Sequence, residues 1–116
     1  MVEESAVFLS AAELPVEQLG DGISRQMLAF NDQIMMVKVM FAAGSEGYLH
    51  HHFHSQVTYV ESGEFDVTVG DETRTMVAGD SYYMAPNVEH GAVCKKAGVL
   101  LDVFSPARED FLEGGN

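Results

Sequence analysis

The sequence predicts an all-β fold, a sandwich or barrel of short antiparallel strands, and two observations support this prediction. Short runs rich in Val, Phe, Tyr, Met and Thr recur along the chain at regular spacing, and turn-forming Gly, Asp and Asn residues separate them. Many short strands with such turns are typical of an antiparallel sandwich or barrel. The runs lie at residues 25–30, 34–41, 56–63, 64–70, 73–79, 80–85, 91–95 and 98–104.

Alternation of side chains supports the individual strands. In the run 64–70, Phe65, Val67 and Val69 fall on one face because successive side chains of a strand point to opposite sides. The runs at residues 34–41 and 98–104 are apolar on both faces, which predicts that both faces are covered. A second sheet or a second subunit could supply this cover, and we expect a homodimer.

The length of 116 residues predicts one domain, spanning residues 1–116, with a core of normal size. Helix is expected only as single turns at residues 14–19 and 108–115. The longest apolar run, residues 34–43, is interrupted by a lysine and is too short to span a bilayer. No secretory leader opens the chain, and Cys94 is its single cysteine. We therefore expect a cytoplasmic protein with no membrane partner, in which Cys94 is a buried small apolar side chain.

The charge balance restricts the possible partners. Eighteen acidic residues against six basic ones give a formal net charge of −12. Binding to nucleic acid requires a basic face, so we expect no nucleic acid partner. An anionic small molecule would need a local positive centre, either a metal ion or a well-placed arginine, because the chain as a whole repels anions.

The histidines suggest such a centre. Four of the five lie within five consecutive positions, and the fifth lies far downstream. On a regular strand, one face would carry His50, His52, His54 and Gln56, and His51 would point the opposite way. Imidazoles two positions apart can bind one transition-metal ion. A solvated histidine run is the alternative, but the glutamine on the same face and the distant fifth histidine favour a metal site.

Two segments resemble the motifs of the cupin family: HHHFHSQVTYVESGEF, which begins at His50, and GDSYYMAPNVEH, which ends at His90. The resemblance implies a small double-stranded β-barrel, an antiparallel jelly roll. It also implies one divalent metal ion, with ligands at His50, His52, Gln56 and His90, and His54 beside them or at the surface. Histidine ligands suit Zn, Ni, Mn and Fe alike. A neutral amide at the usual glutamate position leaves the ion its full charge, which makes it a stronger Lewis acid.

A second group of residues lies in the segment GVLLDVFSPAREDFL. Asp102 interrupts an apolar strand, where an unpaired carboxylate is costly to bury, and Arg108 follows after a short turn. Leu100, Asp102 and Phe104 share a face of that strand. One interpretation is a structural Asp102–Arg108 ion pair. The other makes Asp102 a general acid or base near the metal and Arg108 the group that holds an anion.

Three segments, GISRQMLAFNDQIMMVKVMF, LHHHFHSQVTYV and LLDVFSPAREDFL, together resemble the family of pectin degradation protein KdgF. This family implies an enzyme that converts 4,5-unsaturated monouronates, released by pectin or alginate lyases, into linear 4-deoxy-5-keto uronates. The resemblance places the catalytic residues at Asp102, Phe104 and Arg108, with Phe104 and Arg108 also binding the substrate. The expected partner is therefore a small anionic sugar.

Two other functions fit the same residues. A metal-dependent cupin dioxygenase would use a similar set of histidines, although a neutral glutamine ligand is poorly suited to stabilising Fe(III). A non-catalytic cupin module that binds sugar or metal would show binding without turnover. The sequence is compatible with both alternatives. It is also compatible with both pectin-derived and alginate-derived substrates.

Overall fold

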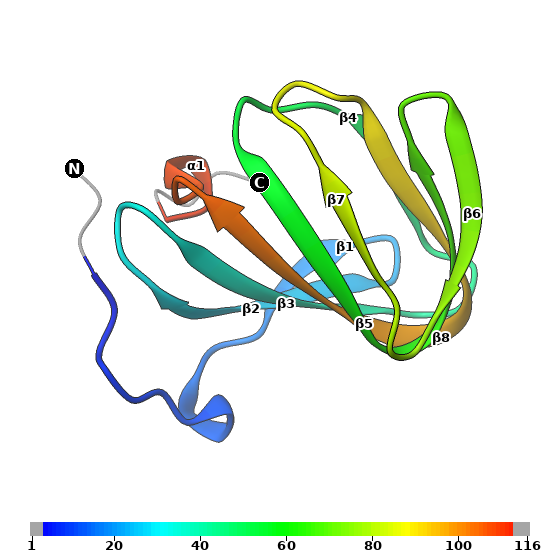
Figure 1. Cartoon of the computed structure of the whole chain (residues 1–116). Coiled ribbons are helices and arrows are strands. Elements are labelled where there is room, and N and C mark those ends of the chain that lie inside the picture. The colour runs from blue at the N-terminus through cyan, green and yellow to red at the C-terminus, as the bar shows by residue number, and fades with distance from the viewer. Residues whose placement is uncertain (1–3, 113–116) are drawn as a thin grey trace.

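Two long strands, β5 (Ser55–Val69) and β8 (His90–Ser105), form the centre of the fold (Figure 1). In the computed structural model, which describes residues 4–112, these strands pair antiparallel along nearly their whole length. Shorter strands extend the pair on both sides: β1 (Glu17–Gly20), β2 (Ile23–Phe30), β3 (Met35–Phe41), β4 (Glu46–His50), β6 (Glu72–Val77) and β7 (Ser81–Met84). Two short helices complete the described chain, the 3-10 helix η1 (Ala11–Glu13) and α1 (Glu109–Leu112).

The long strand pair bends near its middle, and two glycines make this bend possible. The register between β5 and β8 shifts repeatedly between Val60 and Phe65. Gly63 has a φ of 86°, a conformation that residues with a Cβ rarely adopt. A Cβ on Gly98 would collide with the backbone of Ser62 and Gly63. Glycine at both positions therefore lets the two backbones approach closely where the strands change direction.

The bend divides one eight-stranded sheet of the described residues into two halves. On one side of it, β8 pairs with β3, and β5 pairs with β7. On the other side, β8 pairs with β4, and β5 pairs with β6. In Figure 1, β4 and β6 accordingly lie to one side of β5, while β2 and β3 lie to the other. The apolar side chains packed inside this folded sheet include Phe41, Val60, Phe65, Val67, Ala92, Cys94 and Leu100.

A second apolar cluster lies beneath the C-terminal helix α1. It consists of Met35, Val37, Phe104 and Ala107, with Phe111 packed against it. This cluster anchors α1 next to the end of β8 (Figure 1).

The all-β prediction is confirmed, and the expected alternation in β5 is present, with Phe65 and Val67 buried. Cys94 is fully buried, as expected. The structure joins the predicted strands 56–63 and 64–70 into β5, and 91–95 and 98–104 into β8. The reason is that the residues between the runs continue the pairing through the bend instead of forming turns.

The predicted helical turn at residues 14–19 is wrong. The helical turn ends at Glu13, and Glu17–Gly20 pair with β2 as strand β1, which the sequence did not predict. The turn predicted at residues 108–115 is confirmed as α1, while its last three residues lie outside the described part of the chain. Within residues 4–112, no helix has both the length and the apolar character needed to cross a membrane.

Candidate metal centre and active site

Three of the predicted metal ligands lie together. His50 is the last residue of β4, His90 is the first of β8, and these two residues pair across the strands. His52 lies in the segment between β4 and β5. One ligand atom of each imidazole lies within 4.8 Å of the others, so these three residues could hold a metal ion.

Backbone carbonyl groups hold each of these imidazoles through its second nitrogen. Nδ1 of His50 lies 2.8 Å from the carbonyl oxygen of Tyr48, and Nδ1 of His90 lies 2.9 Å from that of Val88. A carbonyl oxygen only accepts hydrogen bonds, so each Nδ1 carries the proton and leaves Nε2 with a free lone pair. Nε2 of His90 is buried and has no hydrogen-bond partner among the described residues. This is the arrangement that metal-binding histidines adopt.

The contacts of His52 also fit a cation. Its Nδ1 lies 3.2 Å from the carbonyl oxygen of His54, and its Nε2 lies 3.0 Å from Oε1 of Gln56. The amide nitrogen of Gln56 donates to Thr58, so Oε1 is oriented as an acceptor. A neutral imidazole has one N–H and cannot satisfy both acceptors. A metal ion bound by Nε2 and Oε1 would remove this conflict, so the residues present fit the ion.

The protonation of the histidines favours metal binding as well. Burial, followed by the positive charge of Arg108, lowers the pKa of His52 to about 4. Burial also lowers the pKa of His90. Neutral imidazoles at physiological pH keep a lone pair available to a metal ion.

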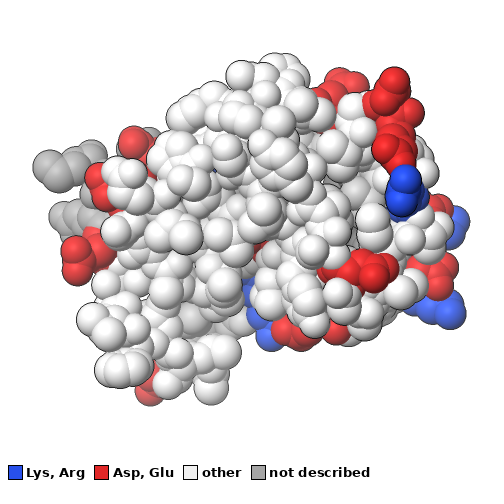
Figure 2. Space-filling view, viewed as in Figure 1, with Lys and Arg blue, Asp and Glu red and all other residues white. Residues whose placement is uncertain are grey.

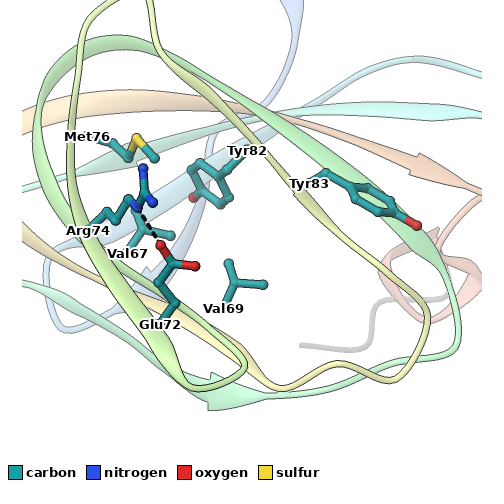
Figure 3. A pocket seen from close by; sticks show the side chains of 7 residues that line it. All are labelled: Val67, Val69, Glu72, Arg74, Met76, Tyr82 and Tyr83. Atoms are coloured by element: carbon teal, nitrogen blue, oxygen red, sulfur yellow. Dashed lines mark hydrogen bonds and ion pairs between the residues drawn. The ribbon is translucent and has the colours of Figure 1, made fainter.

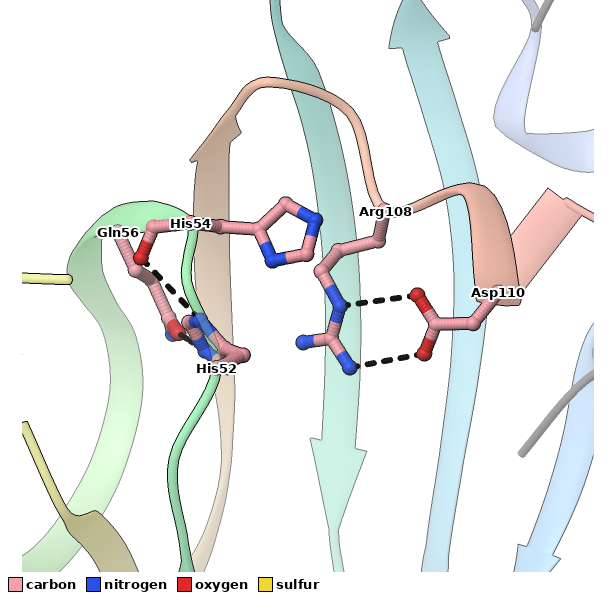
Figure 4. Close-up of polar contacts among 5 residues, drawn as sticks. All are labelled: His52, His54, Gln56, Arg108 and Asp110. Carbon is pink, nitrogen blue, oxygen red and sulfur yellow. Dashed lines mark hydrogen bonds and ion pairs between the residues drawn. The ribbon is translucent and has the colours of Figure 1, made fainter. Parts of the chain in front are cut away.

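The other two clustered histidines are not part of this group, although the ring of His54 lies 5.3 Å from that of His52. The regular strand that would align His54 with the ligands does not exist, because β4 ends at His50 and residues 51–54 belong to no strand. His54 is buried and stacks on Phe53, with ring centroids 4.0 Å apart. Figure 4 shows its imidazole between the backbone near Gln56 and the side chain of Arg108. His51 is exposed.

Asp102 faces the same interior from the second half of β8. It lies opposite Thr58 of β5, whose hydroxyl donates a hydrogen bond of 2.7 Å to the Asp102 carboxylate. Burial is the main cause that raises the pKa of Asp102 to about 6, partly offset by hydrogen bonds from Thr58 and Gln56. A carboxyl group with such a pKa can both accept and release a proton near neutral pH.

The alternative of an Asp102–Arg108 ion pair is wrong. Within the part of the chain that the structure describes, the carboxylate bonded to Arg108 belongs to Asp110. The register of β5 and β8 places Asp102 beside Thr58, and α1 brings Asp110 back over the arginine.

A cavity of about 120 Å³, open on one side, joins the two groups of residues. Its lining includes His50, Gln56, His90, Asp102, Phe104 and Arg108. A wider groove of about 480 Å³ lies outside it, lined by residues 52–54 and 106–110. Arg108 lines both hollows, so it stands where the groove meets the cavity. The Asp102-containing segment and the histidine motifs thus form one site.

Three further residues of this site were not predicted from the sequence. Thr58 is fully buried and links Gln56 to Asp102 through two hydrogen bonds. Tyr82 also bonds to Thr58, and burial, together with the charge of Asp102, raises its pKa above the usual range. Asp110 bonds to Arg108. Alternation along β5 could have indicated Thr58, two residues beyond Gln56, but its partner depends on the strand register.

A different hollow, of about 290 Å³, lies over β6 and β7 (Figure 3). Its charged residues, Arg74 and Glu72, pair with each other and are both well exposed. Its remaining lining is Val67, Val69, Met76, Tyr82 and Tyr83. This hollow has none of the titratable clusters that the cavity near Asp102 contains.

The fold and the site together define a small β-barrel protein in which three histidines lie close enough to hold a metal ion. Comparison with known proteins agrees with this class, because residues 37–104 match the family described as Cupin domain. The chain is 46% identical to the pectin degradation protein KdgF of Dickeya dadantii over 102 residues, which cover 86% of this chain and 93% of that protein. The chain therefore belongs to the cupin family, and within it to the family of pectin degradation protein KdgF.

Two solved structures are similar over almost the whole chain. An RmlC-like cupin from Shewanella frigidimarina is 50% identical, with a TM-score of 0.92, and the match covers 94% of this chain and 98% of that one. The structure of KdgF from Halomonas sp. is 32% identical, with a TM-score of 0.88, and the match covers 92% of this chain and 99% of that one.

Proposed function

We propose that this protein converts 4,5-unsaturated monouronates, from pectin or alginate lyase digestion, into linear 4-deoxy-5-keto uronates by opening the cyclic enol ether. The observation that carries the proposal is the cavity shared by His50 and His90, a carboxyl group of raised pKa and a partly buried arginine. The similarity to pectin degradation protein KdgF over most of both chains supports it.

For the metal centre, we propose one divalent ion held by His50, His52, Gln56 and His90. The support is the ring orientation of the three histidines and the opposed acceptors on His52 and Gln56. Such donors suit Zn, Ni, Mn or Fe. When bound, the ion would supply Lewis acidity toward the oxygen atoms of the sugar.

Asp102 would move the proton. In a cyclic monouronate, its carboxylate accepts the proton of the anomeric hydroxyl as C1 becomes a carbonyl and the bond between C1 and the ring oxygen breaks. The ring oxygen leaves as the enolate of C4 and C5, and Asp102 returns the proton to C4 to give the 5-ketone. The reaction is an isomerisation that needs no oxidant and no water. Its proton transfers match a carboxyl group whose pKa of about 6 lies near neutrality.

Arg108 and Phe104 would bind the substrate. The guanidinium carbon of Arg108 lies 5.2 Å from the centroid of the Phe104 ring, and both side chains line the cavity. Arg108 supplies the local positive charge that a chain of net charge −12 needs to hold a carboxylate. Phe104 offers an apolar wall for the sugar ring.

We also propose a homodimer. Four apolar side chains lie in register across neighbouring strands: Met36 of β3, Val103 of β8, Val57 of β5 and Tyr83 of β7. Three of them are well exposed, Met36 at 38%, Val57 at 48% and Tyr83 at 60%. Figure 2 shows that the face over β5 and β7 has few charged side chains, which gather at its edges. A second copy would cover this apolar face. Sedimentation should show a dimer at micromolar concentration, and Val57→Glu should shift it to a monomer.

The remaining proposals concern the domain and its location. We propose a single domain that spans residues 1–116, supported by the continuous pairing of β-strands through the described residues. A cytoplasmic location is supported by the single, buried Cys94, which suits a reducing compartment.

The test of the function mixes the purified protein, free of any histidine tag, with lyase-generated unsaturated monouronates. Loss of the ultraviolet absorbance of the C=C bond should be fast with the metal-loaded protein. Elemental analysis should give one divalent ion per chain, and the His50→Ala/His52→Ala double variant should lose both the ion and the activity. A metal-free double variant with full activity would refute the role of the ion.

The same samples separate the alternative functions. Oxygen consumption that accompanies turnover would indicate a dioxygenase. Binding of the sugar without loss of the C=C absorbance would indicate a non-catalytic module. Both pectin-derived and alginate-derived monouronates should be tested, because their stereochemistry differs.

A further inference from the structure

The side chain of Arg108 packs against two aromatic rings, Phe104 and Phe111, which also contact each other. Its guanidinium carbon lies 4.2 Å from the centroid of Phe111 and 5.2 Å from that of Phe104. The side chain is only 13% exposed. These contacts restrict the arginine to the boundary between the outer groove and the inner cavity, both of which it lines.

Asp110 fixes the remaining freedom of this side chain. Nε and Nη2 of Arg108 donate hydrogen bonds of 3.1 and 2.9 Å to the two carboxylate oxygens of Asp110. The pair therefore uses one edge of the planar guanidinium group. Figure 4 shows that the third guanidinium nitrogen points away from Asp110, toward His52 and Gln56. The free edge of the fork thus faces the metal centre.

Both restraining residues come from the single turn of α1 (Glu109–Leu112). Phe111 also contacts a second cation: the guanidinium carbon of Arg25 lies 4.1 Å from the centroid of the Phe111 ring. Burial alone would raise the pKa of Asp110, but the hydrogen bond and the charge of Arg108 lower it. The Asp110 carboxylate therefore stays ionised at neutral pH.

We propose that Asp110 and Phe111 are positioning residues, which hold Arg108 so that its free edge receives the carboxylate of the substrate beside the metal centre. This inference rests on the proposed function. A bidentate partner on one edge leaves two N–H groups directed along the other edge, and this geometry matches a carboxylate. The role of the C-terminal turn is thus to orient the cationic group that binds the sugar acid.

A purely structural ion pair would behave differently. The Asp110 side chain is 48% exposed and that of Arg108 is 13% exposed, so solvent reaches the carboxylate and screens this half-exposed ion pair. Loss of its charge should therefore leave the fold intact and change how the substrate is held. The neighbouring Glu109 provides a matched control, because it is an exposed carboxylate on the same turn and bonds to no described arginine side chain in the structure.

The experiment compares Asp110→Asn with Glu109→Gln in the metal-loaded protein. Asp110→Asn should raise KM for the unsaturated monouronate by about tenfold, with kcat changed less, because a loosely held arginine binds the carboxylate poorly. Glu109→Gln should change neither constant by more than about twofold, and both variants should melt close to the wild type. Phe111→Leu, which removes the ring but keeps an apolar side chain, should also raise KM.

A double-variant cycle shows whether the effect passes through Arg108. In an Arg108→Lys background, which lacks the fork, Asp110→Asn should cost less than about a further twofold in kcat/KM. Additive losses would show that Asp110 acts elsewhere and would overturn the proposal. A lower KM in Asp110→Asn would also overturn it, because Asp110 would then compete with the substrate for Arg108.

The failure of this proposal is distinguishable from the failure of the proposed function. Wild-type turnover with normal kinetics in Asp110→Asn would overturn the positioning role alone. Absence of wild-type turnover would refute the proposed function, and the positioning role would then depend on calorimetric binding of galacturonate, a saturated uronate. Its affinity should be about tenfold weaker in Asp110→Asn than in the wild type, and equal affinities would overturn the proposal.

Discussion

On either side of the bend at Gly63 and Gly98, the paired strands β5 and β8 direct different kinds of side chains inward. Beyond the bend, Phe65 of β5 lies opposite Cys94 of β8, and both are fully buried in an apolar cluster. Before the bend, Thr58 lies opposite Asp102 and forms a hydrogen bond with it. The same strand pair therefore contributes an apolar pair to the core on one side of the bend and a buried polar pair to the candidate site on the other, while His90 of the site begins β8 beyond the bend.

The difference shows how this fold accommodates buried polar groups. Gln56 donates to Thr58, and Thr58 donates to Asp102, so the polar half is satisfied by a chain of hydrogen bonds. Burial of such groups without partners would be costly. The apolar half stabilises by packing instead, with Phe41 and Phe65 in an edge-to-face contact at 5.2 Å. Changes in the two halves should therefore have different consequences.

The largest effect is expected from Asp102→Asn in the polar half. The amide keeps the shape of the side chain but removes the group that transfers the proton, so turnover should fall by about 10²–10⁴-fold. The folded state should persist, because the substitution removes a buried charge. Turnover and melting temperature should be measured on the same samples. A strongly destabilised variant with a near-normal rate per folded molecule would contradict the catalytic role.

Phe65→Ala tests the apolar half. Phe65 is fully buried, and its removal should lower the free energy of unfolding by about 3–5 kcal/mol through lost burial and the remaining cavity. Turnover per folded molecule should stay near that of the wild type, since the ring lies in the core cluster and outside the lining of the active-site cavity. Denaturant titration and an activity assay at low temperature would measure both. A selective loss of turnover would show that the two halves are coupled.

The pH dependence of stability should also distinguish the halves. Because burial raises the pKa of Asp102 to about 6, the native state binds this proton more tightly than the unfolded chain does. The contribution of Asp102 to the stability of the metal-free protein should therefore fall as pH rises from 4 to 6, by at most about 3 kcal/mol, and then level off. Partly buried His52, whose pKa is lowered to about 4, acts in the opposite sense over this range, so the Asp102 slope is the difference between the wild type and Asp102→Asn. Asp102→Asn should lose this slope and Phe65→Ala should keep it. Denaturation at a series of pH values would show whether the slope follows Asp102.

The smallest effect is expected from Thr58→Val, which keeps the shape of the side chain and removes its hydroxyl. Asp102 would lose a donor and Gln56 an acceptor, so turnover should fall by about tenfold. Thr58→Ser keeps the hydroxyl and should restore most of the rate. Equal losses in the two variants would indicate that packing by the methyl group matters, and that the hydrogen bonds do not.

Much of the site was predictable because its residue types are unusual for their positions. Imidazoles at His50 and His52 have metal-ligand spacing within one short segment, and Asp102 is a carboxylate inside an apolar strand. These signals are local, and resemblance to known motifs identified the glutamine and the last histidine of the set. Thr58 and Asp110 gave no such signal, because a threonine in a strand and an aspartate in a terminal turn are ordinary residues.

The sequence by itself determined the strand pattern, the buried faces and the chemical groups available for a site, because alternation and turn residues act over a few positions. Only the tertiary structure decided which of these groups meet. The register of β5 against β8 pairs Asp102 with Thr58, and the turn of α1 gives Arg108 to Asp110. Both outcomes depend on where a long strand pair bends and how the chain returns over it. Such long-range geometry is set by packing of the whole barrel, which no short segment encodes.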